Sequence, residues 1–202
     1  AIGSSGQSKV FKRSNNDWYQ IGDVFEQSQG SYSDNSLSND GSIFAFGDLS
    51  NDDNGQDSGQ VSVYKNTNGE WLQIGSDING DNPGDYLGAS IDLSDDGSVI
   101  ALGSPGNDDN GQYSGKVSVY KNTNGEWLQI GSDINGEAAD DNFGSEKGSI
   151  SLSADGSIIA IGAWGSDVNG ENSGNVTIYK NVNDNWEKMT DFNSLLFRGD
   201  GK

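Results

Sequence analysis

The chain has 202 residues, with 31 acidic and 11 basic side chains, so its formal charge at pH 7 is −20. This acidity excludes a nucleic-acid binder that works through a basic patch. The absence of Cys and His from the sequence removes disulfides, thiolate metal sites and the commonest proton shuttle. Because no run of about 18 apolar residues occurs, the sequence also predicts no membrane insertion.

An internal repeat organises the whole sequence. Residues 59–80 and 115–136 are identical except at one position, which is Gln60 in the first copy and Lys116 in the second. Two more diverged copies flank them, so that an equivalent Trp recurs in four places. These residues, which we expect to pack between repeats, are Trp18, Trp71, Trp127 and Trp186. The spacing predicts repeat units near 1–30, 31–84, 85–141 and 142–190, with 191–202 completing the first unit.

Each unit has the pattern of short strands joined by turns. Apolar residues alternate with polar ones and are bounded by Gly, Asn and Asp. In the third unit we expect four strands, near residues 88–93, 98–103, 116–121 and 126–131. Asp-Gly and Asn-Gly turns would join them as antiparallel hairpins. Four antiparallel strands in each repeat predict an all-β fold of the β-propeller class.

The two ends of the sequence match parts of one repeat. Residues 1–3 resemble the end of a second strand, and residues 195–201 resemble a first strand with its turn. We therefore expect one domain over residues 1–202, a propeller of four blades of four antiparallel strands. It would be closed by pairing the C-terminal first strand with the N-terminal strands. The alternative is a section of a longer array of blades.

Two acidic loops carry oxygen-bearing side chains at alternating positions, which is the donor set that Ca²⁺ prefers. The predicted ligands are Asp77, Asn79, Asp81 and Asp85 in the first loop, and Asp133, Asn135, Glu137 and Asp141 in the second. The alternative for both loops is a solvated acidic turn without an ion.

The last full unit resembles a known repeat family. It begins with Phe143-Gly144-Ser145 and continues through an Asp-Gly turn at 155–156 and an apolar strand that ends near Trp164. This order resembles the FG-GAP repeats of integrin α-subunit propellers. The resemblance implies an extracellular β-propeller that binds or adheres, commonly with calcium, and that is not an enzyme.

Trp164 stands apart from the repeat, because the other copies have Leu49 and Pro105 at its position. It falls in a predicted loop with Asp167, Asn169 and Glu171. An exposed aromatic ring beside polar groups can stack on a sugar face and bind its hydroxyls, so these four residues form a predicted ligand-binding site. The alternative is that Trp164 covers the end of the blade.

Taken together, these patterns predict a non-enzymatic extracellular module for binding, structure or adhesion, with Ca²⁺ in its acidic loops. The expected partner is a protein or glycan at a cell surface, and self-assembly through the terminal blade is also expected. Two alternatives stay open. One is a lectin-like carbohydrate binder, and the other is a glycoside hydrolase with a buried pair of carboxylates, outside the repeat, in the central funnel.

Overall fold

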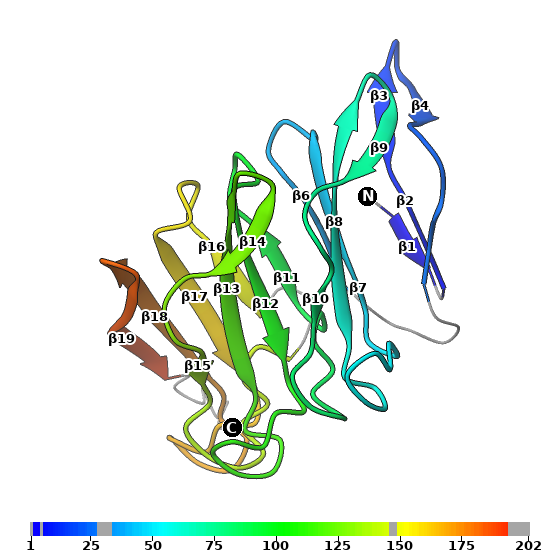
Figure 1. The fold of residues 1–202 in the computed structure, drawn as a ribbon. Helices are drawn as coiled ribbons and strands as arrows, with labels where there is room; N and C mark the ends of the chain where they lie inside the picture. The colour runs from blue at the N-terminus through cyan, green and yellow to red at the C-terminus, as the bar shows by residue number, and fades with distance from the viewer. Residues whose placement is uncertain (1, 5, 28–33, 146–148, 194–202) are drawn as a thin grey trace, which may run out of the picture.

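The computed structural model describes residues 2–4, 6–27, 34–145 and 149–193. These residues form β-strands and turns without a helix, and the strands form antiparallel sheets that stand side by side in an arc (Figure 1). The predicted all-β propeller class is confirmed. Among the described residues there is no helix long and apolar enough to cross a membrane.

We call the strands of each repeat unit a blade and number the blades along the chain; blades 2, 3 and 4 each form one sheet, whereas blade 1 forms two. Blade 1 contains β1 (Ile2–Ser4), β2 (Gln7–Lys9) and β5 (Phe25–Glu26), with the hairpin β3 (Phe11–Ser14) and β4 (Asp17–Gln20). Blade 2 contains β6 (Asn35–Leu37), β7 (Ile43–Asp48), β8 (Gln60–Thr67), β9 (Glu70–Gln73) and β10 (Ile78–Asn79). Blade 3 contains β11 (Ile91–Leu93), β12 (Val99–Ser104), β13 (Lys116–Thr123), β14 (Glu126–Gln129) and β15 (Ile134–Asn135). Blade 4 contains β16 (Ile150–Leu152), β17 (Ile158–Ala163), β18 (Asn175–Val182) and β19 (Asn185–Asn193).

The strands run outward from the centre of the arc in chain order. The first strand of blade 3 (β11) contacts the first strands of blades 2 and 4 (β6 and β16), so these three strands lie on the inner side of the arc. In blade 3, strands β11, β12, β13 and β14 lie close to where the alternating pattern placed four strands. The turns form because Gly97 (φ 68°) and Gly125 (φ 92°) accept backbone angles that a residue with a Cβ adopts at a cost. The short strands β10 and β15 were not predicted. Each follows the fourth strand of its blade in the chain and pairs with the beginning of the third strand.

The apolar core lies between the blades. A cluster of aliphatic side chains joins blades 2 and 3, a second joins blades 3 and 4, and a mainly aromatic cluster joins blades 1 and 2. Because each strand directs alternate residues to its two faces, one sheet can contribute to the clusters on both sides. This arrangement explains how a sequence with only 31% hydrophobic residues forms a packed fold.

Three of the repeated Trp side chains connect neighbouring blades, as the repeat predicted. The indole Nε1 of Trp127 donates a hydrogen bond to the backbone oxygen of Ile74 in the preceding blade, at 2.9 Å. Trp71 and Trp186 make the equivalent bonds, at 3.0 and 2.9 Å. Trp18 differs, because its side chain is 66% exposed.

The predicted closure depends on the two ends of the chain. β1 pairs with β2 in the register expected of a second strand, with Ile2 opposite Lys9. Residues 195–201, which would supply the closing strand, lie outside the described residues. The number of blades in the closed propeller, the closure itself and the exact unit boundaries stay predictions.

Candidate functional site

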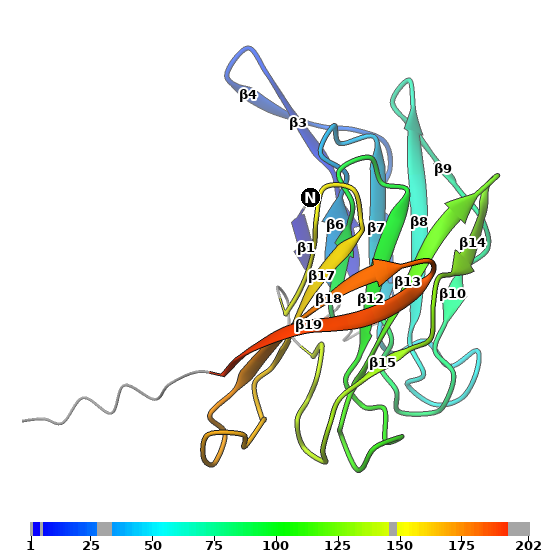
Figure 2. The same ribbon diagram turned by 90° about the vertical axis from the view of Figure 1, so that its left-hand side faces the viewer.

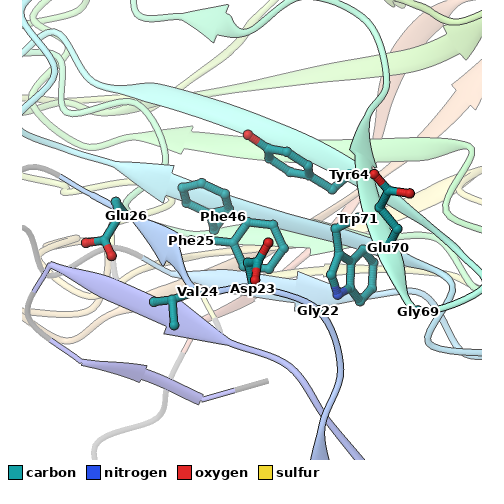
Figure 3. Close-up of a pocket in the computed structure, with 10 residues that line it drawn as sticks. All are labelled: Gly22, Asp23, Val24, Phe25, Glu26, Phe46, Tyr64, Gly69, Glu70 and Trp71. Atoms are coloured by element: carbon teal, nitrogen blue, oxygen red, sulfur yellow. The ribbon is translucent and has the colours of Figure 1, made fainter.

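A pocket of about 580 Å³ opens between blades 1 and 2, near the outer strands. Its walls come from the segment that links β4 to β5, from the middle of β7 and β8, and from the start of β9 (Figure 3). Ten residues line the pocket: Gly22, Asp23, Val24, Phe25, Glu26, Phe46, Tyr64, Gly69, Glu70 and Trp71.

Aromatic rings form the floor of this pocket. The ring centroids of Phe25 and Tyr64 lie 4.9 Å apart, and those of Phe46 and Tyr64 lie 5.8 Å apart. Trp71 contacts Phe25 edge to face, with the centroids 5.9 Å apart. Phe25 and Phe46 are buried. Such a floor provides an apolar surface against which the carbon face of a small cyclic molecule can pack.

Three carboxylates stand at the mouth of the pocket, on exposed residues. Glu26 accepts a hydrogen bond of 3.2 Å from the side chain of Gln7. Figure 3 shows the Asp23 carboxylate in front of the Phe25 ring, and the Glu70 side chain extending in the direction opposite to the Trp71 ring. The described lining residues include no Lys or Arg. The pocket therefore combines an apolar floor with a negatively charged rim.

Tyr64 adds a polar group to the aromatic floor. Burial raises the pKa of its hydroxyl, and the negative charge of Asp77 raises this pKa further. The hydroxyl therefore stays protonated at neutral pH and can donate a hydrogen bond.

The pocket differs from the same place in the other blades. Phe25 corresponds to Ile78 and Ile134, whereas Asp23 corresponds to Ser76 and Ser132. Between blades 3 and 4 the equivalent pocket measures about 200 Å³. The aromatic floor and the Asp23 carboxylate are therefore particular to the first junction. Neither feature was predicted from the sequence, although the departure of Asp23 and Phe25 from the repeat is a signal that could have identified them.

Two further carboxylates that do not recur in the repeat lie at the inner strands: Asp92 is within β11 and Asp34 directly precedes β6. Asp92 in β11 accepts a 2.7 Å hydrogen bond from the backbone nitrogen of Leu152 in β16. Asp34 accepts a 3.1 Å bond from the backbone nitrogen of Ile91 in β11. Burial raises the pKa of Asp92, although its hydrogen bonds act in the opposite direction. These two side chains join the inner strands of successive blades, which is a structural role.

The four predicted ligands of the first calcium loop make hydrogen bonds or ion pairs with other protein groups. Asp77 accepts hydrogen bonds from Ser62 and Gln73, both within blade 2. Asn79 accepts one from Gln60. The other two predicted ligands are also engaged, because Asp81 pairs with Lys116 and the buried Asp85 accepts hydrogen bonds from Asn82.

The second loop is likewise engaged with protein groups. Asp133 accepts hydrogen bonds from Ser118 and Gln129, both at 2.6 Å. Glu137 pairs with Lys188 at 2.7 Å, and Asp141 accepts hydrogen bonds from the backbone nitrogens of 137 and 138. Asn135 pairs with the third strand through its backbone. Within the described chain, no group of three or more His, Cys, Asp or Glu side chains could hold a metal ion. The described residues therefore do not fit a calcium site.

The predicted ligand-binding group lies in the loop between β17 and β18. Trp164 is 53% exposed, and Asp167, Asn169 and Glu171 are exposed as well. Asp167 caps its own loop by accepting a 2.6 Å hydrogen bond from the backbone nitrogen of Asn172. Ligand binding by these four residues stays a prediction.

Comparison with known proteins gives structural matches only. No family model matches the chain, and no curated protein matches it in sequence. A proposed 6-phosphogluconolactonase from Bacteroides fragilis matches with a TM-score of 0.53 and 13% identity, over 84% of this chain and 41% of that one. The periplasmic gluconolactonase of Pseudomonas aeruginosa matches with a TM-score of 0.53 and 16% identity, over 98% of this chain and 66% of that one. The chain thus spans less than two thirds of the length of either protein, and the likeness establishes the fold.

These matches overturn the FG-GAP resemblance, because the matched propellers are named as lactonases and no family model supports the repeat family. The short motifs have a structural cause that any such blade shares. A Cβ on Gly144 would lie 2.6 Å from Val117, and Gly156 (φ 68°) forms a tight turn. The packing and turns of a blade therefore explain these motifs, and the motifs do not show that the chain belongs to the FG-GAP family.

The functional expectations that followed from that resemblance are also corrected. A non-enzymatic adhesion or structural module is wrong, and so is a protein or glycan partner at a cell surface, because both matched proteins are named for enzymes that act on small lactones. The acidic turns and the repeated Trp, on which those expectations rested, recur in the blades as structural features, whereas the pocket contains residues that break the repeat between blades 1 and 2.

Proposed function

We propose that this chain hydrolyses a lactone in the pocket between blades 1 and 2. The observation that carries the proposal is the pocket itself, in which an aromatic floor and an acidic rim include residues, Asp23 and Phe25, that differ from their counterparts in the other repeats. The fold likeness to two proteins named for lactone chemistry supports it by analogy.

Lactone hydrolysis needs a general base, a hydrogen-bond donor for the carbonyl oxygen and a surface that positions the lactone ring. Water adds to the lactone carbonyl, the ring C–O bond breaks, and the product is an open-chain hydroxy acid. Asp23 is suited to accept the proton from the attacking water and to return it to the ring oxygen as the C–O bond breaks. The Tyr64 hydroxyl is suited to donate a hydrogen bond to the carbonyl oxygen, which becomes negative when water adds. Phe25 and Phe46 would hold the apolar face of the ring.

The rim favours an uncharged substrate. The described lining contains three carboxylates and no cation, and the whole chain carries a charge of −20. A phosphorylated lactone would be repelled by these charges. We therefore propose an unphosphorylated sugar lactone. A location outside the cytoplasm also remains part of the proposal, because one matched protein is periplasmic.

The test is lactone hydrolysis followed by acid release, with glucono-1,5-lactone and its 6-phosphate as substrates. Asp23→Asn should lower kcat by about 100-fold or more, which is the usual contribution of a general base. Glu70→Gln should raise KM, whereas Glu126→Gln, the same residue in the nearly identical repeat, should leave the kinetics unchanged. Lack of hydrolysis by the native chain, or equal effects of the two Glu variants, would argue against the proposal.

A further inference from the structure

The lining of the pocket between blades 1 and 2 is rich in hydrogen-bond acceptors and poor in donors. Among the described lining side chains, only the Tyr64 hydroxyl and the Trp71 indole can donate. The Nε1 of Trp71 already donates to the backbone oxygen of Ile21, at 3.0 Å. This leaves Tyr64 as the remaining side-chain donor in the described lining, whereas each ionised carboxylate of the rim accepts hydrogen bonds only.

The negative charge of the rim is not compensated by a cation. Glu26 accepts its 3.2 Å hydrogen bond from Gln7, which is an uncharged side chain. Within the part of the chain that the structure describes, the ion pairs do not include Asp23, Glu26 or Glu70. A ligand in the pocket is therefore exposed to the charge of three carboxylates.

The equivalent pocket between blades 3 and 4 has a different charge. Blade 4 is seen from the side of β19 in Figure 2. The side chains at the positions of Asp23, Glu26 and Glu70 are uncharged in that pocket; they are Ser132, Asn135 and Asn185. Its lining contains the carboxylate of Asp133, which lies 3.6 Å from the Lys116 ammonium. Because the Tyr and the Trp of the lining are the same in both pockets, packing of the blades does not require the three rim carboxylates.

The aromatic floor attracts the same kind of group as the rim. The face of an aromatic ring has a negative electrostatic potential, so it attracts a cation that lies within about 6 Å of the ring centre. The Asp23 carboxylate stands in front of the Phe25 ring (Figure 3). A cationic group at this place would be attracted by the carboxylate and by the floor, whereas an anionic group would be repelled.

We infer that this pocket binds a ligand that carries a protonated amino group. An ammonium group donates three hydrogen bonds and accepts none, which complements a lining made of acceptors. For the lactone hydrolysis proposed above, on which this step rests, the substrate class is then the lactone of an amino sugar. The carbon face of its ring packs on the aromatic floor, and its ammonium group lies at the acidic rim. Such a substrate gains an attraction that an uncharged lactone lacks.

Binding of two sugars that contain no lactone tests this charge preference without hydrolysis. D-Glucosamine carries an ammonium group at slightly acidic pH, whereas N-acetyl-D-glucosamine carries an uncharged amide at the same carbon. The indole N–H signal of Trp71 in a nitrogen–proton NMR spectrum reports on the pocket, because Trp71 lines it. We expect glucosamine to bind about fivefold more tightly or better at low salt. Added salt should reduce the difference, because the rim is exposed.

Two variants that change the net charge equally locate the effect. Glu26→Gln removes a rim carboxylate and should weaken glucosamine binding by about two- to fivefold, while binding of N-acetylglucosamine stays the same. Glu126→Gln removes an exposed carboxylate that does not line this pocket, and it should leave the binding of both sugars unchanged. Equal losses in the two variants would show a general attraction by the charge of −20 and would overturn the inference.

Failure of this inference is distinguishable from failure of the proposed function. A native chain that prefers glucosamine but hydrolyses no lactone would support the cationic ligand and contradict the hydrolysis. A native chain that hydrolyses gluconolactone but binds the two sugars equally, or binds neither, would support the hydrolysis and overturn the inference.

Discussion

The ammonium of Lys116 lies 2.5 Å from the carboxylate of Asp81, and this pair links the loop after blade 2 to the third strand of blade 3. Asp133, from the outer part of blade 3, lies 3.6 Å from the same ammonium. Burial alone would lower the pKa of Lys116, but Asp81, Asp133 and Asp85 outweigh it and raise the pKa. The side chain is therefore a buried cation at neutral pH, close to where the sequence predicted Ca²⁺.

Substitution of Lys116 should depend on whether the new residue can bond to Asn135. In the nearly identical blade 2, Gln60 donates to Asn79 at 2.9 Å, whereas the equivalent Oδ1 of Asn135 is buried without a partner. We expect Lys116→Gln to change the free energy of unfolding by less than about 1 kcal/mol, because a new hydrogen bond offsets the lost ion pair. Lys116→Met offers no such bond and should cost about 1–3 kcal/mol. Urea denaturation measures both, and equal losses would contradict this account.

Added calcium should leave the native chain unaffected. The predicted ligands are bound by protein donors, and two of them face the Lys116 ammonium. A ligand specific for the folded state at ten times its Kd would add about 1.4 kcal/mol of stability. We expect no such gain at millimolar Ca²⁺ in a calorimetric melt. The control is NaCl at equal ionic strength, because screening the charge of −20 can itself raise the transition temperature. A rise with CaCl₂ beyond that control would show that the loops do hold the ion.

Because Trp186 packs closely on Gly131, replacement of this glycine should lower the free energy of unfolding. A Cβ at Gly131 would lie 2.8 Å from Trp186 Cδ1, whereas a Cβ at Gly125 would meet nothing within 4 Å. Both residues have positive φ, so Ala at either site carries a backbone cost of about 1–2 kcal/mol. Gly131→Ala should cost about 1–3 kcal/mol more than Gly125→Ala, because the indole must move. Denaturant unfolding of the two variants isolates the difference; similar values would mean that the indole adapts freely.

The hairpin turn at Asp155 should titrate at unusually low pH. Hydrogen bonds from Ser153, then from the backbone and side chain of Ser157, lower the pKa of Asp155 to about 2. This lowered pKa stabilises the fold above the unfolded-state pKa, and the contribution is lost as the pH falls through about 2. Carbon NMR of the Asp155 carboxyl gives the value directly. Ser153→Ala should raise the pKa toward its ordinary value, and an unchanged pKa would contradict the assigned cause.

Much of the fold could be predicted because the same pattern of strands and turns recurs in each unit of the sequence. Alternating residues specify strands, and an Asp-Gly or Asn-Gly pair specifies the turn that follows. The candidate pocket could not be found in this way. Asp23, Phe25 and Tyr64 belong to three different strands or linkers in two blades, and only the packing of those blades brings them together. The repeat pattern also describes only what the copies share, so it does not identify the residues that differ between them.

The sequence by itself determined the all-β repeat and its turns, since local backbone preferences and alternating burial are properties of neighbouring residues. Only the tertiary structure decided which charges meet and which side chains are buried. Lys116 and Asp81 are 35 positions apart, so their pairing depends on how two blades dock. The burial of Ile159 and the exposure of Val176 likewise depend on how whole blades pack. Contacts between distant residues depend on the packing of whole blades, and local sequence does not encode that packing.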